Sequence, residues 1–512
     1  MCFPFVQCSG SQWRVAGDWR DDRIAQLEKE NAELRAQLAE ALKRIAELEE
    51  KLGKSSRNSS RSPSSDTPAQ VAERRKKAAA ITNPGGGRRP GGQPGHEKFT
   101  RQLVPPDRVN RHVDCIPDQC ERCSKRLRGR DPEPQLHQVF HLPEVRPLVD
   151  QYALHALRCP DRECGHVTVG KLPDGVPRGA FAPSVIATVA LLLGVCRLGR
   201  RTVQAVLADL FNLPMSLGGV VGCQQLASAA LQSPVEEAKQ AASRAAFKHC
   251  DETSWREGAK RAKVWLWVMV TKRLVVFQIH KERSAQAARD LLVRVRGALI
   301  SDRYSSYSFW PVWLRQVCWA HLIRDFVAIA ERGGESERIG DGLLDEARRL
   351  FAWWHRVRDG TLKRSTFQVY VRNLQKRVGA LLEKGRSCAH PRTARTCAEI
   401  IKVWPALWLF VEREGIEPTN NDAERQVRHA VLWRKSSGGT HSEPGSRFVE
   451  RVLTVVGTLR RQDRNVFTFL REACEAQLSG SQVPSLQPFQ GAKCLKSRVA
   501  DNHAPRSRRT IS

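Results

Sequence analysis

The feature that most constrains the fold is a run of short apolar segments between residues 246 and 302. Three segments have strand character, and they are Ala246–Asp251, Lys263–Val270 and Leu274–His280. A helical pattern begins at Ser284 and ends near Val295, and Gly297–Asp302 again has strand character. Short apolar runs bounded by turn residues favour strands, whereas a longer amphipathic run favours a helix. The order strand, strand, strand, helix, strand therefore predicts a mixed sheet.

This order of elements is the opening of a ribonuclease H-like fold, in which the first and fourth strands are neighbours. Arg315–Val317 is a candidate fifth strand, and a helix-rich stretch follows at about residues 326–416. We therefore predict a catalytic domain over residues 245–475 with a helical insertion at about 326–416. The chain as a whole is predicted to be an α+β multidomain protein.

Three carboxylates fit this sheet as a catalytic set. Asp251 and Asp302 end the first and fourth predicted strands, and Glu424 lies at the start of a predicted helix, within Asn420-Asn-Asp-Ala-Glu-Arg425. Carboxylate oxygens are the ligands that Mg²⁺ or Mn²⁺ prefers. A pair of such ions can activate an attacking oxygen and stabilise a leaving one. Each residue taken singly is equally well explained by a capped turn or a surface ion pair.

The charge of the chain points to an anionic partner. Lysine and arginine number 84 against 54 acidic residues, for a formal net charge of +30. Such an excess favours nucleic acid or an anionic membrane surface. The longest apolar run, Ala182–Cys196, is shorter than the roughly 20 residues that span a bilayer, so we expect DNA and no membrane. Four residues could bind its phosphates or form a solvated basic face: Arg425, Arg428, Arg434 and Lys435.

Two cysteine pairs predict a structural zinc site. Cys120 and Cys123 form one CxxC pair, and Cys159 and Cys164 form a second pair about 35 residues later. Zinc prefers four ligands in a tetrahedron, and two such pairs supply two thiolates each. We therefore predict a zinc-binding module over residues 102–170; scattered reduced thiols are the alternative. The cysteine spacing, with no evident signal peptide, indicates a reducing, cytoplasmic compartment, and DNA binding implies association with the nucleoid.

The N-terminal part has the pattern of a coiled coil over residues 21–52. Leucine, isoleucine and alanine recur at heptad positions, with Asn31 at an a position, which typically fixes register in a parallel pair. A homodimer or higher oligomer is expected. The alternative is a single amphipathic helix packed against the core of its own chain, which would have the same pattern. Residues 53–101 form a basic, Ser- and Gly-rich linker that is predicted to be disordered. Residues 480–512 are expected to be a disordered basic tail.

Residues 180–235 have helical character, with turn signals near Leu213–Leu217. This region is either a helix-turn-helix, whose second helix near Val220–Leu231 enters a DNA groove, or a plain helical hairpin. The second helix has no basic stripe, so the sequence leaves both interpretations open.

Several motifs together resemble transposases of the insertion-sequence-66 family, from the coiled coil to about residue 475. They are Lys54-Ser-Ser, Gly91-Gly-Gln-Pro-Gly-His96, the cysteine pairs, Asp251-Glu-Thr, Cys318-Trp-Ala-His321, Asn420–Arg425 and Arg434-Lys435. The resemblance implies a catalytic domain with two aspartates and a glutamate, interrupted by helices between the second aspartate and the glutamate. Many members have glycine after that aspartate, where this chain has Arg303. The difference indicates a subgroup encoded by a single reading frame, which leaves open whether accessory proteins are partners.

The predicted function is that of a DNA transposase. It would hydrolyse a phosphodiester at the ends of an insertion sequence and transfer the strand into target DNA, with Mg²⁺ or Mn²⁺ at Asp251, Asp302 and Glu424. One alternative is a zinc-containing, sequence-specific DNA-binding regulator derived from a transposase and catalytically silent. Another is a structural coiled-coil adaptor, which leaves the three carboxylates and the net charge without a role.

Overall fold

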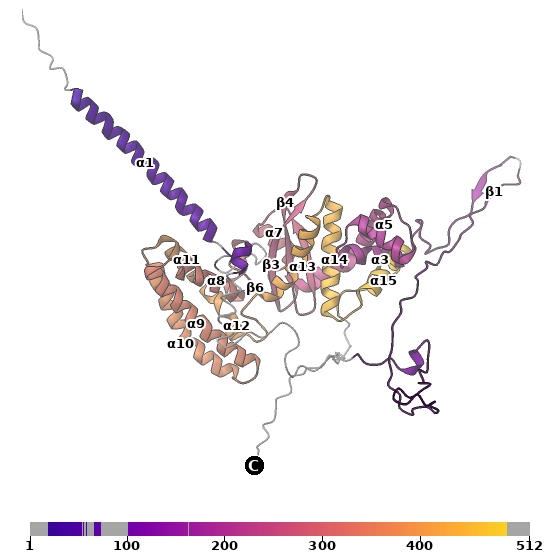
Figure 1. Ribbon diagram of the computed structural model, residues 1–512. Helices are drawn as coiled ribbons and strands as arrows, with labels where there is room; N and C mark the ends of the chain where they lie inside the picture. Colours follow the sequence, from indigo (N-terminus) through magenta and orange to yellow (C-terminus); the bar gives the residue numbers. More distant parts are fainter. Residues whose placement is uncertain are drawn as a thin grey trace, which may run out of the picture. The chain divides into compact units, whose positions relative to one another are not determined.

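The computed structural model describes residues 19–53, 55, 58, 66–72, 101–161 and 163–488 (Figure 1). These residues divide into two compact units, which fall within residues 1–82 and 320–402 and within residues 83–319 and 403–512. The predictions for most of the linker and for the tail after residue 488 lie outside the described residues. Within the described ranges, no helix is long and apolar enough to cross a membrane.

A five-stranded mixed sheet in the order β5–β4–β3–β6–β7 forms the centre of the second unit. The strands are β3 (Phe247–Glu257), β4 (Ala262–Val270), β5 (Val275–His280), β6 (Ala298–Ser301) and β7 (Arg315–Val317). β3 pairs antiparallel with β4, and β4 with β5, whereas β3, β6 and β7 run parallel. The predicted mixed sheet is therefore confirmed, including the neighbouring first and fourth strands.

β3 extends further than the sequence pattern indicated. The prediction that Asp251 ends the first strand is wrong, because β3 remains paired with β4 from His249 to Glu257. Its pairing with β6, however, ends at His249 opposite Ile300. The apolar pattern of the sequence follows the part of β3 that is covered by strands on both sides. Asp251 thus lies just beyond the end of the parallel ladder, where only one neighbouring strand remains.

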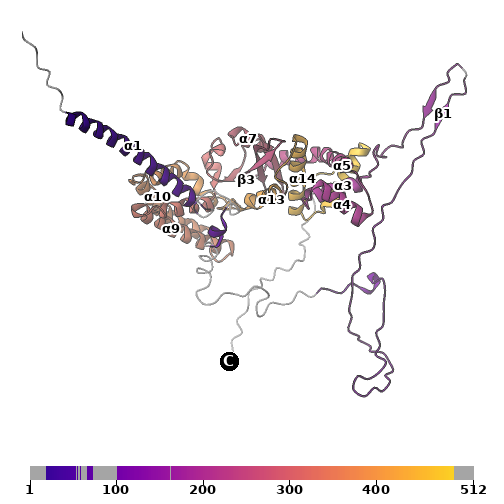
Figure 2. The same cartoon turned by 45° about the horizontal axis from the view of Figure 1, so that its top comes forward.

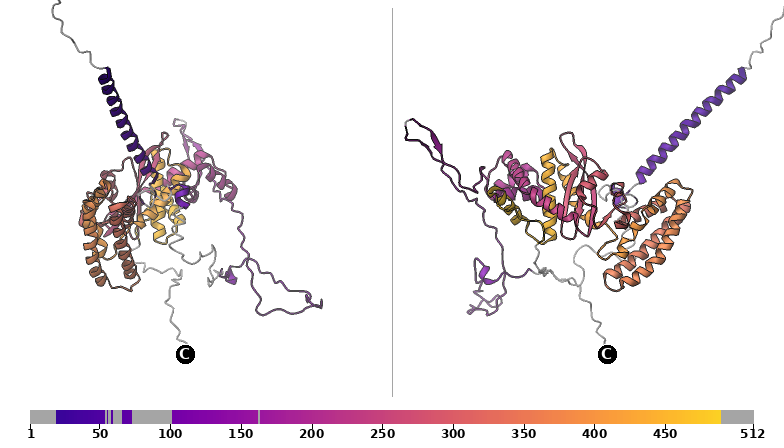
Figure 3. Two further views of the ribbon diagram at one scale, coloured as in Figure 1. Left: turned by 60° about the vertical axis from the view of Figure 1, so that its left-hand side comes forward. Right: turned by 180° about the vertical axis from the view of Figure 1, so that it is seen from behind.

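The helix α14 (Glu443–Arg461) covers the edge strand β5, and Figure 3 shows α14 beside the sheet. The hydroxyl groups of Thr458 and Thr454 accept hydrogen bonds from the backbone N–H groups of Val275 and Phe277, at 3.0 and 2.9 Å. The carboxylate of Glu450 accepts from the N–H of Ile279. The three helix residues are four positions apart and the three strand residues are two positions apart. The contacts repeat because four residues of a helix and two residues of a strand both cover about 6 Å. The outward N–H groups of the sheet edge are thereby satisfied.

Four helices precede the sheet: α3 (Pro183–Gly194), α4 (Arg200–Phe211), α5 (Leu217–Ala230) and α6 (Gln232–Ser243). α5 contacts α3, α4, α14 and α15 (Val466–Ser479), and Figure 2 shows α3, α4 and α5 grouped together near α14. Its exposed positions include Gln225 and Leu226 and no basic residue. α5 is therefore a packed helix, and its position favours the helical hairpin over a DNA-reading helix.

The first unit consists of α1 (Trp19–Gly53) and the helices of the insertion. The insertion helices are α8 (Trp319–Ala330), α9 (Gly334–Arg358), α10 (Arg364–Arg386) and α11 (Pro391–Ile401). α10 packs on α9 and α11, and Glu346 of α9 binds Arg377 of α10 through two hydrogen bonds of 2.8 Å. Residues 320–402 are the part of the chain after β7 that belongs to this unit, and the helical insertion was predicted at about residues 326–416.

The residues that follow the insertion return to the sheet. They form the 3-10 helix η5 (Trp404–Leu407) and the short helix α12 (Leu409–Glu412). The side chain of Gln316 in β7 donates to the carbonyl oxygen of Leu407 at 3.2 Å and accepts from the N–H of Phe410 at 2.9 Å. These contacts attach the residues after 402 to the last strand of the sheet.

Residues 101–170 contain no buried residue among those described. It contains the 3-10 helix η2 (Pro106–Arg108) and a hairpin of β1 (Ala156–Arg158) and β2 (Val167–Val169). The first residues of the predicted tail, in contrast, are packed. Leu486 is fully buried, and Ser485 donates a hydrogen bond to Glu237 at 2.8 Å.

Candidate active site

Asp251 and Asp302 occupy equivalent positions on neighbouring parallel strands. His249 of β3 is the register partner of Ile300 of β6. Asp251 lies two residues beyond His249, and Asp302 lies two residues beyond Ile300. Because side chains alternate between the faces of a sheet, residues two apart share a face. The two carboxylates therefore emerge on one face at the carboxyl end of β6, and both are half-buried.

Glu424 lies in the first turn of α13 (Asn421–Ser437), a helix that packs on β3 and β4. Asn420, which is fully buried, fixes the start of this helix. Its side-chain amide donates to the carbonyl oxygen of Cys250 at 2.6 Å, and its side-chain oxygen lies 3.1 Å from Nδ1 of His249. The backbone N–H of Asn420 donates to Sγ of Cys318 at 3.1 Å. Glu424 is thereby held against the residues that flank Asp251.

The electrostatics of Asp251 indicate that the carboxylates are close to one another. Burial raises the pKa of Asp251 well above its usual value, and the negative charges of Glu252, Asp302 and Glu424 raise it further. Carboxylates held together in this way repel each other, and a bound cation would relieve the repulsion. In the described residues, the oxygens of Asp251, Asp302 and Glu424 do not all lie within 4.8 Å of one another. Their separation therefore exceeds that of three ligands around one ion.

Asp422 is a second carboxylate in the first turn of α13, two residues before Glu424. In the structure its carboxylate binds the guanidinium of Arg461 and, at 3.3 Å, that of Arg425. Glu424, unlike Asp422, is among the charges that raise the pKa of Asp251. The geometry therefore favours Glu424 as the third carboxylate.

Glu252 is a fourth carboxylate at this end of the sheet, and sequence reasoning missed it. It follows Asp251 directly and so points to the opposite face of β3. The hydroxyl of Tyr307 donates to it at 2.5 Å, and Arg283 forms an ion pair with it at 2.6 Å. Burial raises the pKa of Glu252 to about 7, with a further increase from Asp302. The only signal in the sequence was its place beside Asp251, which does not reveal buried partners.

The network around Glu252 fixes the segment that carries Asp302. The guanidinium of Arg283 stacks 3.6 Å from the ring centre of Tyr304, and the N–H of Tyr304 donates to Asp302 at 2.9 Å. On the other side, buried Arg315 donates to the backbone oxygen of Asp302 at 3.1 Å. Asp302 is therefore positioned by Tyr304, by Arg315 of β7 and, through Tyr304, by Arg283 in the loop before α7 (Ala285–Leu292). Tyr307, which binds Glu252, lies in the 3-10 helix η3 (Ser305–Tyr307).

The predicted phosphate-binding residues of α13 differ in their surroundings. Arg425, Arg428 and Lys435 are exposed. Arg434, in contrast, donates to the hydroxyl of Ser254 at 2.7 Å and to that of Thr253 at 3.2 Å, as well as to the carbonyl oxygen of Ser254. Arg434 thus attaches the last turns of α13 to β3, a structural role that the sequence did not indicate.

Each predicted zinc-binding pair lies in a tight turn. Backbone N–H groups of Arg122 and Cys123, and the Cys123 thiol, direct hydrogen bonds to the sulfur of Cys120 and lower its pKa. The second pair follows β1, where the N–H of Cys159 donates to His166 at 2.8 Å and that of Cys164 to Asp161 at 3.2 Å. No three of the four sulfurs lie within 4.8 Å of one another in the described residues. The structure therefore forms both turns but does not bring them together.

Comparison with known protein families agrees with this architecture. A family model for transposases matches residues 178–447, a span that contains all three carboxylates and the helical insertion. It is described as the Transposase IS66 family, and because the match covers more than half of the chain, the protein belongs to that family. A second model, described as a family of unknown function (DUF6444), matches residues 17–102. No curated protein matches the chain.

Proposed function

We propose that this member of the family is an active transposase that cuts DNA at the ends of its element and joins the freed 3′-hydroxyl to target DNA. The observation that carries the proposal is the surroundings of Asp251. Asp251 and Asp302 each follow a register partner of the parallel pair β3 and β6 by two residues, and burial together with the charges of Glu252, Asp302 and Glu424 raises the pKa of Asp251. The strand order and directions of the sheet support a ribonuclease H-like catalytic domain.

The donor set fits Mg²⁺ or Mn²⁺, since three carboxylates and water supply only oxygen ligands. Asp251, Asp302 and Glu424 would hold the ions. Two such ions, when bound, activate the attacking oxygen and stabilise the leaving one. The chain itself contributes rigid positioning: Asn420 and Cys250 fix the helix of Glu424, and Arg315, Tyr304 and the Glu252 network fix Asp302. Sites held this rigidly favour the correctly aligned reaction geometry.

The experiment that tests this function uses purified protein and DNA that carries the inverted repeats flanking the gene. Incubation with Mg²⁺ should release ends with a 3′-hydroxyl and yield strand-transfer products, and Mn²⁺ should substitute for Mg²⁺. Binding of this DNA without any cleavage under both metals would instead support a catalytically silent DNA-binding regulator.

Arg425, Arg428 and Lys435 are proposed to contact DNA phosphates, since they are exposed on the helix that carries Glu424. Phosphate contacts position a protein on DNA without reading its sequence. Arg434 contributes instead by holding α13 to β3.

A structural zinc ion is proposed to join the two cysteine turns through Cys120, Cys123, Cys159 and Cys164. The lowered pKa of Cys120 favours the thiolate that zinc binds, and a segment without buried residues needs a link other than an apolar core. We expect protein purified without chelator to contain about one zinc ion per chain by metal analysis. Cys120→Ser with Cys159→Ser should remove that zinc, whereas Cys196→Ser, an exposed cysteine outside the turns, should not. Zinc retained by the double variant would contradict the assignment.

The helix α1 is proposed to pair with a second copy of the chain. The large apolar side chains that are described between residues 24 and 45, among them Ile24, Leu27 and Leu34, are 41 to 62% exposed, and the sequence of α1 follows the heptad pattern of a two-stranded coiled coil. We expect a chain that lacks residues 19–53 to be a monomer by light scattering, and the full chain to be a dimer or larger. A truncated chain that remains dimeric would show that another surface carries assembly.

A further inference from the structure

A cavity of about 310 Å³ lies among α13, α14 and the residues that follow α3. Its polar side chains are Arg197, Gln426, His429, Arg460 and Arg461, and none of its lining residues is acidic. The remaining lining residues are glycine, valine, leucine and phenylalanine. A volume near 300 Å³ is at the lower end of the range for small-ligand sites.

The positive charge of this cavity is only partly balanced by the protein. Arg461 binds the carboxylate of Asp422, but no such partner lines the cavity for Arg197 or Arg460. Burial lowers the pKa of His429, and the charges of Arg460, Arg197 and Arg428 lower it further. Arg197 is half-buried, whereas His429 and Arg460 are exposed. Like charges gathered in this way repel one another unless an anion is present. The site therefore has the electrostatics of an anion-binding pocket.

Arg197 occupies a backbone conformation that arginine rarely adopts. Its φ is +59°, and the N–H of Leu198 beside it donates to Leu192 at the end of α3. Left-handed positions after a helix are usually filled by glycine or asparagine. One terminal nitrogen of the Arg197 guanidinium, Nη1, is buried without a hydrogen-bond partner in the described part of the chain. An arginine kept at a strained position with an unsatisfied buried donor indicates a role for its side chain.

The C-terminal end of a helix attracts cations, which accounts for Arg460 and Arg461 in the last turn of α14. The same effect favours Arg197, which follows the C-terminal end of α3, but it does not account for His429 in the middle of α13. Three separate elements thus direct cationic or neutral donors into one cavity.

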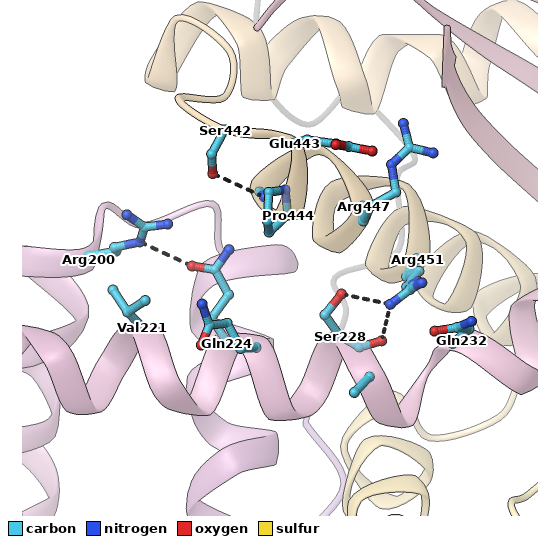
Figure 4. Close-up of a pocket in the computed structure, with 13 residues that line it drawn as sticks. Arg200, Val221, Gln224, Ser228, Gln232, Ser442, Glu443, Pro444, Arg447 and Arg451 are labelled. Atoms are coloured by element: carbon cyan, nitrogen blue, oxygen red, sulfur yellow. Dashed lines mark hydrogen bonds between the residues drawn. The ribbon is translucent and has the colours of Figure 1, made fainter. Parts of the chain in front are cut away.

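A larger cavity of about 560 Å³ between α5 and the start of α14 provides a comparison (Figure 4). Its arginines have protein partners: Arg451 donates to Ser228 at 2.8 Å, Arg200 to Gln224 at 3.0 Å, and Arg447 pairs with Glu450 at 3.0 Å. Glu443 also lines it. The arginines of this larger cavity are therefore held by the protein, whereas Arg197 and Arg460 remain available to a ligand.

We propose that the cavity of Arg197, His429 and Arg460 binds a backbone phosphate of the DNA on which the transposase acts. The inference rests on the proposed function, and the net charge of +30 favours DNA as the source of the phosphate. Residues 424 and 426 of α13 are rotated by about 200° from each other around the helix. The cavity, which is lined by Gln426, is therefore on another side of α13 than Glu424, so its phosphate is a different one from the scissile phosphate.

The test measures binding of the full-length chain to a fluorescein-labelled duplex, with no magnesium or manganese added. One duplex carries the terminal inverted repeat and a second has a scrambled sequence. We expect Arg197→Asn and Arg460→Gln each to weaken binding to both duplexes about tenfold. The slope of log affinity against log salt should fall by about one for each variant. Asparagine tolerates the left-handed backbone at position 197, so this variant should fold as well as wild type.

Arg471→Gln is the matched control, since it removes one exposed arginine of α15 that is paired only with Glu475, at 3.6 Å. It should bind both duplexes as wild type does. Affinities and salt slopes of the two cavity variants that equal those of Arg471→Gln would overturn the proposal.

A second experiment, with inorganic phosphate, distinguishes between DNA and a free anion as the ligand of the cavity. Phosphate should raise the Tm of the wild type more than chloride at equal ionic strength, and it should raise the Tm of Arg197→Asn less. Suppose that phosphate raises the Tm less in Arg197→Asn than in the wild type, but that the variant binds DNA with wild-type affinity. The cavity would then bind a free phosphate or nucleotide, and the proposal that it binds DNA would be refuted. Binding is measured without cleavage, so an inactive catalytic centre would contradict the proposed function and leave this result standing.

Discussion

Exchanging Asp251 or Asp302 for asparagine, or Glu424 for glutamine, is expected to lower strand cleavage at least about 10³-fold. Each amide preserves the shape of the side chain but removes a negative charge and a metal ligand. DNA binding should remain within about twofold of wild type, because phosphate contacts are made by arginine and lysine elsewhere. The effect should be large for each residue alone, since residues that act as a unit fail together.

The measurement compares cleavage of labelled terminal DNA with binding of the same DNA. Glu417→Gln is the control: Glu417 is exposed and precedes α13, so its amide should cleave at the wild-type rate. A variant of Asp251, Asp302 or Glu424 that cleaves as fast as Glu417→Gln would remove that residue from the site.

Gly297→Ala is expected to destabilise the second unit by about 3–5 kcal/mol, from backbone strain and steric overlap together. Gly297 has a φ of +73° directly before β6, and a Cβ there would lie 2.4 Å from the carbonyl oxygen of Ala246 and 2.6 Å from that of Ala245. Backbone atoms cannot move aside as a flexible side chain can. The variant must therefore shift β6, and Asp302 with it, so cleavage should fall as well.

Gly258→Ala isolates the contribution of the strained φ. Gly258 has a φ of +78° but no atom within 4 Å of an added Cβ, so alanine there should cost only about 1–2 kcal/mol. Urea unfolding followed by tryptophan fluorescence compares the two variants. Equal destabilisation by both would show that the contact with Ala245 and Ala246 is unimportant.

The strands and helices of the sheet were predictable because their signals are local. The apolar segments at 263–270 and 274–280 match β4 and β5 within one residue, since a buried strand needs a short continuous apolar run. The same reasoning misplaced the end of β3. Its outer half, Glu252–Glu257, contains polar residues that pair with β4 and bind Arg283, Arg434 and Thr440, and these partners are distant in sequence.

The site was predictable to the extent that it depends on topology. Asp251 and Asp302 follow strands that the pattern already makes neighbours, so their proximity could be anticipated. Asn420, in contrast, was only part of a motif until the structure showed it fully buried and bonded to β3. Burial and partner identity are properties of the packed chain, and a single sequence does not encode them at the residue concerned.

The sequence by itself determined the order of elements, the basic character and the cysteine turns, because each depends on local pattern or composition. It also supplied Asp251, Asp302 and Glu424 as candidates. Only the tertiary structure decided that Glu424, and not Asp422, is among the charges that raise the pKa of Asp251, that Arg434 holds α13 to β3, and that Arg197, His429 and Arg460 share one cavity. Residues a few positions apart on one helix have nearly the same sequence context but point in different directions. What each side chain meets depends on which distant element packs against that side of the helix.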